Sequence, residues 1–100
     1  MFSVVYITTS SLDEAKFIGR TLVKERLAAC VNIFPITSIY HWDGMQEAEE
    51  VVLLAKTTTE NVKRIEQRVK ELHSYDVPCI ISLVIDGSED YLTWIKREVR

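Results

Sequence analysis

The spacing of apolar residues along this chain switches between that of strands and that of helices. Residues 2–8, 30–42, 51–57 and 79–85 are rich in β-branched and aromatic side chains, which favours β-strands. In residues 12–27, and again in the segment that ends near residue 73, apolar side chains recur every three or four positions, which is typical of one helix face. A shorter helical run follows residue 88. The predicted order is strand, helix, strand, strand, helix, strand and a closing helix.

Capping motifs mark the start of both long helices. Ser11 is followed by Glu14, and Thr57 by Glu60, each at the spacing of a capping box. In such a box the hydroxyl and the carboxylate satisfy free backbone N–H groups around the first helical turn. We therefore expect one helix to begin at Leu12 and the other to open with the box that starts at Thr57.

Proline and glycine indicate how the strands are arranged. Pro35 interrupts the second strand, and because proline has no N–H to donate, a bulge or a sheet edge is expected there. The pair Asp43-Gly44 predicts the turn that joins the second and third strands. Two crossovers that each contain a helix fit a four-stranded antiparallel sheet with both helices on one face. The predicted fold class is α+β.

The strands carry more apolar surface than two helices on one face can cover. Strands one and four are apolar on both faces, and the second strand adds Phe34, Tyr40 and Trp42 along a hairpin that is too long for the helices to shield. A row of large exposed apolar groups usually marks a protein interface. The sequence therefore predicts an oligomer.

Composition and charge restrict the class of partner. The chain has 100 residues, of which 47% are hydrophobic, and this size and composition predict a single domain over residues 1–100. A net charge of -3 and a pI near 5.3 leave no basic face for a nucleic acid. No apolar run is long enough for a membrane helix, and the N-terminal apolar segment lacks the basic start of a secretion signal. Cys30 and Cys79 lie far apart, which favours a reduced, cytoplasmic protein over a disulfide scaffold.

Several functions found with this order of elements are excluded because the chain lacks the motifs that they require. The third strand, 51–57, has no aromatic residues on which RNA bases could stack. The loop Thr8-Thr9-Ser10-Ser11 has no C-x-x-C pair for a metal carrier. No glycine-rich phosphate loop is present, because the chain has only three glycines.

Particular strings carry a resemblance to a known family. They are E-R-L-A-A-C-V-N-I at 25–33, S-I-Y-H-W-D-G at 38–44, E-L-H-S-Y-D-V-P at 71–78 and D-Y-L-T-W-I at 90–95. Together they resemble the CutA divalent-cation-tolerance family over almost the whole chain. The resemblance implies a ferredoxin-like βαββαβ sandwich with a long hairpin and a C-terminal helix, and a tight cytoplasmic homotrimer. It also implies a role in tolerance of copper and other divalent cations, without a known catalytic reaction.

The chain departs from the pattern of that family at three places. The family loop usually reads His-Pro-Tyr, whereas Ser74 stands at the proline position here. After Gly44 the usual lysine is absent and the connection is acidic. Some members carry a thiol on the first strand and a histidine before the loop histidine, where this chain has Ile7 and Leu72. Neither of these side chains can bind a metal.

Candidate metal ligands are His73, Cys30 and Asp76. Imidazole sites favour Cu²⁺ among divalent ions, and His73 is the only histidine in the family loop, close in sequence to the carboxylate of Asp76. We expect weak Cu²⁺ binding at His73, with Cys30 or carboxylates nearby. Two of these residues also have a structural interpretation: Cys30 as a packed apolar group, and His73 as a complement to a helix C-terminus.

Asn32 and Lys56 are polar residues within strands, and two roles are open for them. They can line an intersubunit cleft, or hydrogen-bond across a trimer interface.

The leading interpretation of the function is a non-enzymatic trimer that binds divalent metal ions. The alternatives are a trimeric small-molecule sensor like the PII proteins and a structural scaffold. A sensor of that kind needs a long loop between strands two and three with basic groups, which the short acidic turn does not offer.

Overall fold

The computed structural model describes all of residues 1–100. Its elements are β1 (Phe2–Thr9), α1 (Leu12–Lys24), β2 (Cys30–His41), β3 (Met45–Thr58), a short 3₁₀ helix η1 (Thr59–Asn61), α2 (Val62–Leu72), β4 (Ile80–Ile85) and α3 (Glu89–Glu98). The strands form one four-stranded sheet in the order β2-β3-β1-β4, and every neighbouring pair is antiparallel. The predicted α+β class and the ferredoxin-like arrangement are confirmed.

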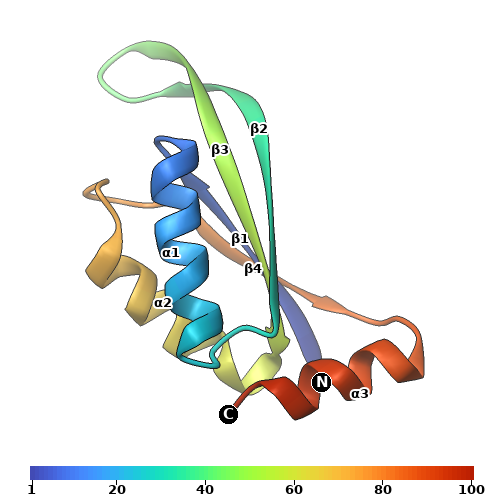
Figure 1. Ribbon diagram of the computed structural model, residues 1–100. Helices are drawn as coiled ribbons and strands as arrows, with labels where there is room; N and C mark the ends of the chain where they lie inside the picture. The colour runs from blue at the N-terminus through green and yellow to red at the C-terminus, as the bar shows by residue number, and fades with distance from the viewer.

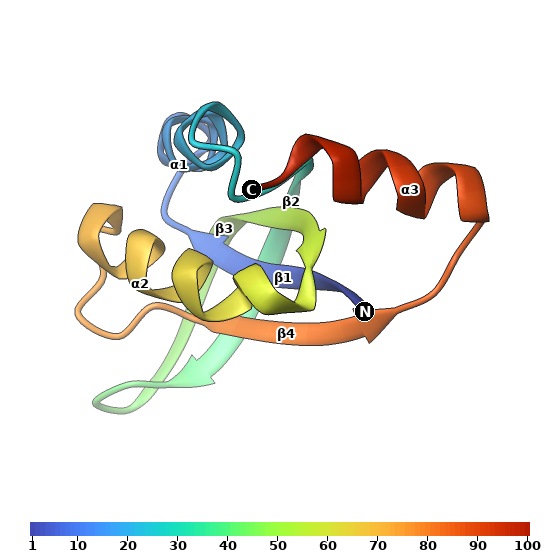
Figure 2. The same cartoon turned by 90° about the horizontal axis from the view of Figure 1, so that it is seen from below.

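One face of the sheet carries the core. The α1 and α2 helices lie side by side on this face, while α3 lies at the opposite end of the molecule from the hairpin tip (Figures 1 and 2). Side chains that alternate along β1 and β3 point to the helices, as the two-residue period of a strand requires. The buried cluster consists of Val5, Ile7, Ile18, Leu22, Leu27, Ala28, Leu53, Ala55, Ile65 and Val69.

The hairpin of β2 and β3 projects beyond the helices (Figure 1). The predicted turn is confirmed, with positive φ at Asp43 (53°) and Gly44 (93°). The β3 strand starts at Met45 and not at residue 51, because its polar first half pairs with β2 from His41 onward. Pro35 lies on the edge strand β2 in unbroken register, so the predicted edge position is correct and no bulge is needed.

The C-terminal end of α1 comes earlier than predicted. The helix ends at Lys24 and not at residue 27, because Arg26 adopts the left-handed conformation with φ 60°. The Arg26 N–H then donates to the Val23 carbonyl and the Leu27 N–H to the Leu22 carbonyl. This pair of hydrogen bonds is a Schellman motif, which usually places glycine at the left-handed position.

The two predicted capping boxes have different outcomes. Ser11 caps α1 as predicted, since its hydroxyl accepts from the Glu14 N–H at 3.1 Å. The box at Thr57 is wrong: Thr57 lies in β3, fully buried, and its hydroxyl donates to the Leu27 carbonyl at 2.6 Å. The α2 helix follows η1 instead and begins without a capping side chain. None of the helices is both long and apolar enough to cross a membrane.

Candidate functional site

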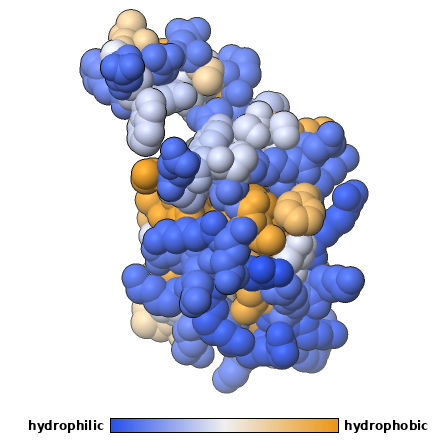
Figure 3. All heavy atoms as spheres, turned by 90° about the vertical axis from the view of Figure 1, so that its left-hand side faces the viewer, coloured by the Kyte–Doolittle hydropathy of each residue, from blue (hydrophilic) through white to orange (hydrophobic).

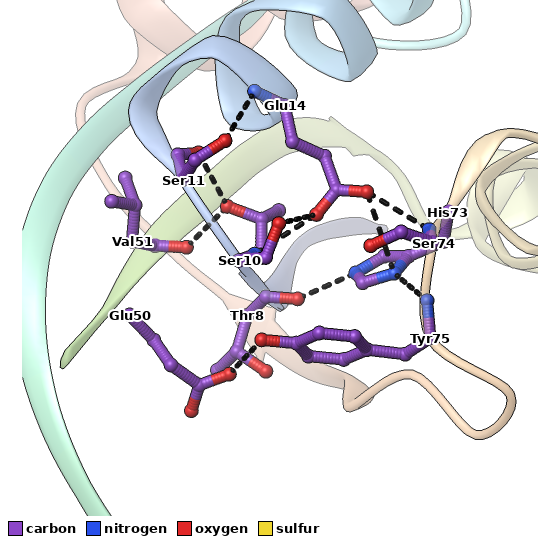
Figure 4. A network of polar contacts seen from close by, with 10 residues as sticks. Thr8, Ser10, Ser11, Glu14, Glu50, Val51, His73, Ser74 and Tyr75 are labelled. Carbon is purple, nitrogen blue, oxygen red and sulfur yellow. Dashed lines mark hydrogen bonds and ion pairs between the residues drawn. The ribbon is translucent and has the colours of Figure 1, made fainter. Parts of the chain in front are cut away.

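The loop between α2 and β4, residues 73–79, carries two of the predicted ligands. His73 ends α2, because its backbone turns to an extended ψ of 145°. At the far end of the loop the Cys79 carbonyl accepts from the Thr8 N–H at 3.3 Å. The loop is thereby placed against the last residues of β1, where the first turn of α1 also begins (Figure 4).

The imidazole of His73 is fully buried and both of its nitrogens have partners. Nε2 lies 2.7 Å from the Thr8 carbonyl oxygen, and Nδ1 lies 3.1 Å from the Tyr75 N–H. A carbonyl can only accept and a backbone N–H can only donate, so the neutral ring carries its proton on Nε2. In this tautomer the lone pair of Nδ1 is used by Tyr75.

Glu14 joins the start of α1 to this loop. Its Oε1 accepts from the backbone N–H and the hydroxyl of Ser10, both at 2.9 Å, and its Oε2 accepts from the Ser74 N–H at 2.9 Å. Burial acts to raise the pKa of Glu14, but the hydrogen bonds from Ser10 and Ser74 outweigh it and lower that pKa to about 2. Oε2 also lies 3.9 Å from His73 Nδ1. The carboxylate is therefore held charged beside the imidazole.

Tyr75 connects the loop to β3. Its hydroxyl donates to Glu50 Oε2 at 2.6 Å, and its ring centroid lies 4.7 Å from that of His73 (Figure 4). Glu50 is only 8% exposed, so this hydrogen bond satisfies a buried carboxylate. Burial first, and then the hydrogen bond and charge of Glu50, raise the pKa of Tyr75 well above its usual range. The phenol therefore stays neutral and acts as a donor.

A pocket of about 320 Å³ lies between this loop and the hairpin. Figure 3 shows the surface hollowed below the projecting tip, with hydrophobic side chains grouped beneath it on an otherwise largely hydrophilic face. The residues that line the pocket are Tyr40, Trp42, Ser74, Tyr75, Asp76 and Val77.

The three predicted metal ligands do not form one site within this chain. Cys30 lies opposite Lys56 in the ladder, and Lys56 lies opposite Val4 of β1, whereas His73 contacts Thr8. Val4 and Thr8 are separated by about 13 Å along the strand. Asp76 is exposed at the pocket, and no group of three His, Cys, Asp or Glu side chains converges on one point. The residues present do not fit a closed copper site in one chain.

Asn32 and Lys56, whose roles the sequence left undecided, lie on the sheet face away from the α1 and α2 helices. Asn32 is exposed opposite Leu54. Lys56 donates to the Tyr91 hydroxyl at 3.3 Å, and its ammonium lies 5.3 Å from the Tyr91 ring centroid. Lys56 therefore has an intrachain partner in α3, which the sequence did not indicate.

The sequence analysis missed the roles of Glu14, Ser74 and Glu50. Glu14 was assigned to a capping box, and the structure directs its carboxylate to Ser10 and to the loop instead. Ser74 stands where the family usually has proline, and its N–H supplies the hydrogen bond to Glu14 that proline lacks. That departure was the one signal in the sequence for this contact.

Comparison with known proteins agrees with this architecture. A family model described as CutA1 divalent ion tolerance protein matches residues 3–98. The divalent-cation tolerance protein CutA of Thermus thermophilus is 50% identical over 100 residues, covering 97% of each chain. That of Archaeoglobus fulgidus is 42% identical over 101 residues, covering 99% of each chain.

Solved structures show the same fold at full length. One is described as the periplasmic divalent cation tolerance protein CutA from Archaeoglobus fulgidus; it has a TM-score of 0.97 and 41% identity, with 100% of both chains covered. The Thermus thermophilus structure has a TM-score of 0.96 and 48% identity, again with 100% of both chains covered. Fold and matches together define a divalent-ion tolerance protein of ferredoxin-like architecture. The chain belongs to the CutA family.

Proposed function

We propose that this chain acts as a non-enzymatic homotrimer in the cytoplasm that serves in tolerance of divalent cations, copper among them. Family membership supports the role in cation tolerance. The trimer is supported by the apolar surface that one chain leaves uncovered. The cytoplasmic location comes from the family resemblance; the Archaeoglobus fulgidus relative is described as periplasmic, so cell fractionation is the test.

The observation that carries the trimer is the sheet face opposite the α1 and α2 helices. Ile81 and Leu83 of β4 lie there, opposite Tyr6 and Val4 of β1, and they are 54% and 59% exposed. Phe34 of β2 lies on the same face and is 41% exposed. Since a monomer in water seldom exposes so many large apolar groups together, this face is suited to contact with other copies.

The hairpin extends the same apolar surface. Tyr40 and Trp42 are 42% and 58% exposed, as the sequence analysis expected of residues beyond the reach of the helices. We propose that the sheet face and the hairpin together bury on the order of 2,000 Å² or more per subunit pair, the size class of an obligate interface.

Sedimentation equilibrium at micromolar concentration tests the trimer, with two variants that change equally exposed residues. Ile81 and Phe17 are both 54% exposed, but Phe17 lies on α1, away from the proposed interface. We expect Ile81→Asp to dissociate the trimer and Phe17→Asp to leave it intact, because a carboxylate buried without a partner costs several kcal/mol. A wild-type species at the monomer mass of 11.6 kDa contradicts the proposal.

Copper binding by His73, with Cys30 and Asp76, is the part of the proposal that one chain supports least. A metal ion at Nδ1 of His73 has to displace the Tyr75 N–H, and one at Nε2 has to displace the proton held on the Thr8 carbonyl. Coordination also requires neutral imidazole, so binding should weaken as the pH falls and the ring takes up a second proton.

Calorimetric titration with Cu²⁺ distinguishes the possible ligands. His73→Ala removes the buried imidazole, and His41→Ala removes the exposed one on the hairpin as a matched control. Loss of affinity in His73→Ala alone supports the proposed ligand. Loss only in Cys30→Ser indicates a thiolate centre, and unchanged affinity in both moves the site elsewhere.

A further inference from the structure

A groove between α1 and β2 contains none of the proposed copper ligands. Its volume is about 430 Å³, within the range of small-ligand sites. β2 is an edge strand, and α1 lies toward this edge of the sheet while α2 lies toward β4 (Figure 2). The hollow, named the α1–β2 groove below, is thus at the side of the molecule.

The direction of the β2 side chains places this groove away from the trimer surface. Val31 and Ile33 line it. They lie opposite Ala55 and Leu53, which are buried beneath the helices. Because side chains alternate along a strand, Phe34, which we assign to the trimer, points to the other face of the sheet. The groove is therefore open in the trimer that we propose.

The floor of the groove is apolar because α1 lies directly on β2. A Cβ added at Gly19 of α1 would lie only 3.0 Å from Val31 Cγ2, so a side chain there would crowd the strand. Ile33 and Val23 extend the floor, and Val23 is 39% exposed although it is apolar. Such a floor is suited to an aliphatic chain, since removing apolar surface from water favours binding.

Three cations follow one another along the rim of the groove. Lys16, Arg20 and Lys24 lie at intervals of four residues on α1, so they share one side of the helix and span about 12 Å. All three are exposed and none forms an ion pair, whereas both lysines of α2 are paired with Glu66. In a chain of net charge -3, this row of free cations is a local exception.

The acidic groups near the rim leave its middle positive. Asp13 lies one turn before Lys16, and Glu98 lines a neighbouring hollow with Lys24. Glu98 is already paired within the chain at 3.5 Å, and neither carboxylate lines the groove. Arg20 is the middle cation, and its planar guanidinium can hold a carboxylate through two parallel hydrogen bonds.

We propose that the α1–β2 groove binds a carboxylate anion that carries an aliphatic chain of medium length. The chain lies on the apolar floor and the carboxylate accepts from Arg20, while Lys16 and Lys24 add positive charge on either side. The rim repels a metal cation, and a small polar anion gains nothing from the floor. The inference is independent of copper binding, and all the lining residues come from one chain.

Calorimetric titration with decanoate tests the site, and sedimentation determines the mass of the same protein. Two further probes are decyltrimethylammonium, which has the same chain and the opposite charge, and hexanoate, which has the same charge and a shorter chain. All are used below the concentrations at which they form micelles. We expect one decanoate per chain and at least about tenfold weaker binding of either other probe, since each fully buried CH₂ group contributes up to about fourfold in affinity.

Three variants test the groups that carry the inference. Arg20→Gln should weaken decanoate binding about three- to tenfold and reduce its dependence on salt. The control Lys63→Gln removes the same charge from α2, where this lysine is 91% exposed, and should change the affinity less than about twofold. Val23→Phe fills the groove from an exposed position and should weaken binding at least about tenfold. Urea unfolding checks that this variant is folded, and Arg20→Gln with the three probes decides if it is not.

Four results overturn the proposal. Equal affinity for decanoate and decyltrimethylammonium indicates an apolar hollow without charge recognition. Unchanged decanoate binding in Arg20→Gln, or an equal loss in Arg20→Gln and Lys63→Gln, shows that Arg20 does not hold the carboxylate. Absence of saturable binding to a species of trimer mass shows that the groove is closed in the assembly, while the trimer itself stands. Binding to phosphatidylglycerol vesicles without binding of free decanoate assigns the cations to a membrane surface.

Discussion

Replacing Glu14 with glutamine tests the contact that joins α1 to the loop carrying His73. The carboxylate accepts hydrogen bonds from Ser10 and Ser74, and its side chain is only 12% exposed. Glutamine keeps the size of the side chain and one carbonyl oxygen. It removes the charge and presents an NH₂ group to one of the donors.

The magnitude follows from the pKa of the carboxyl. The hydrogen bonds lower the pKa of Glu14 from its ordinary value of 4.5 to about 2. A shift of this size corresponds to at most about 3.5 kcal/mol of stability, since one pKa unit is about 1.4 kcal/mol. Water reaches part of the site, so we expect the contribution at neutral pH to be about 2 kcal/mol.

The sign of the pH dependence is determined by the lower pKa in the folded state. At pH between about 4.5 and 2 the unfolded chain binds the proton and the folded carboxyl does not, so acid favours unfolding. This contribution is complete above pH 4.5 and is lost as the pH falls through about 2. The Glu14→Gln variant lacks it at every pH.

Urea unfolding of wild type and variant at several pH values is the assay, at one protomer concentration because oligomerisation changes apparent stability. We expect Glu14→Gln to be about 2 kcal/mol less stable at pH 7 and to approach the wild type near pH 2. The control is Glu66→Gln, a carboxylate at the surface between Lys63 and Lys70, which should change the profile much less. A difference between Glu14→Gln and wild type that stays constant over this range refutes the reasoning.

Further predictions concern three other contacts, each measured by urea or thermal unfolding. Thr57→Val leaves the Leu27 carbonyl without its donor and should destabilise the fold by about 1–3 kcal/mol, and an unchanged midpoint contradicts this. Ser74→Pro removes the N–H that donates to Glu14 while Ser74→Ala keeps it, so the proline variant should be about 1 kcal/mol less stable than the alanine variant. Equal stability of the two shows that the hydrogen bond contributes nothing. Tyr75→Phe leaves a buried carboxylate of β3 without its donor and should lower stability by about 1–3 kcal/mol, whereas a wild-type melting temperature argues against that hydrogen bond.

The order of elements and the α+β class could be derived from the sequence alone. They depend on local features: the period at which apolar side chains recur, the Ser11 cap and the Asp43-Gly44 turn. Each of these is set by residues a few positions apart. The strands and helices could therefore be ordered without any knowledge of which side chains meet in space.

Pairing between strands decided what the local pattern misread. Residues 45–50 are too polar to indicate a strand, and they form one because β2 supplies hydrogen-bond partners beyond the edge of the core. Thr57 has the spacing of a helix cap, but the ladder to β1 and the Leu27 carbonyl keep it in β3. A local propensity is weak beside the hydrogen bonds of a sheet and is overridden by them.

For the candidate site, too, part follows from the sequence and part only from the tertiary structure. The family strings placed His73 and Asp76 in a loop of interest, and family membership is confirmed by the relatives. The position of the imidazole proton is fixed by the Thr8 carbonyl, which lies 65 positions away in the sequence, and the Glu14 carboxylate accepts from the Ser74 N–H, 60 positions away. Such contacts form only when the packed core brings distant segments together, so the sequence could indicate a candidate ligand but only the tertiary structure shows its surroundings.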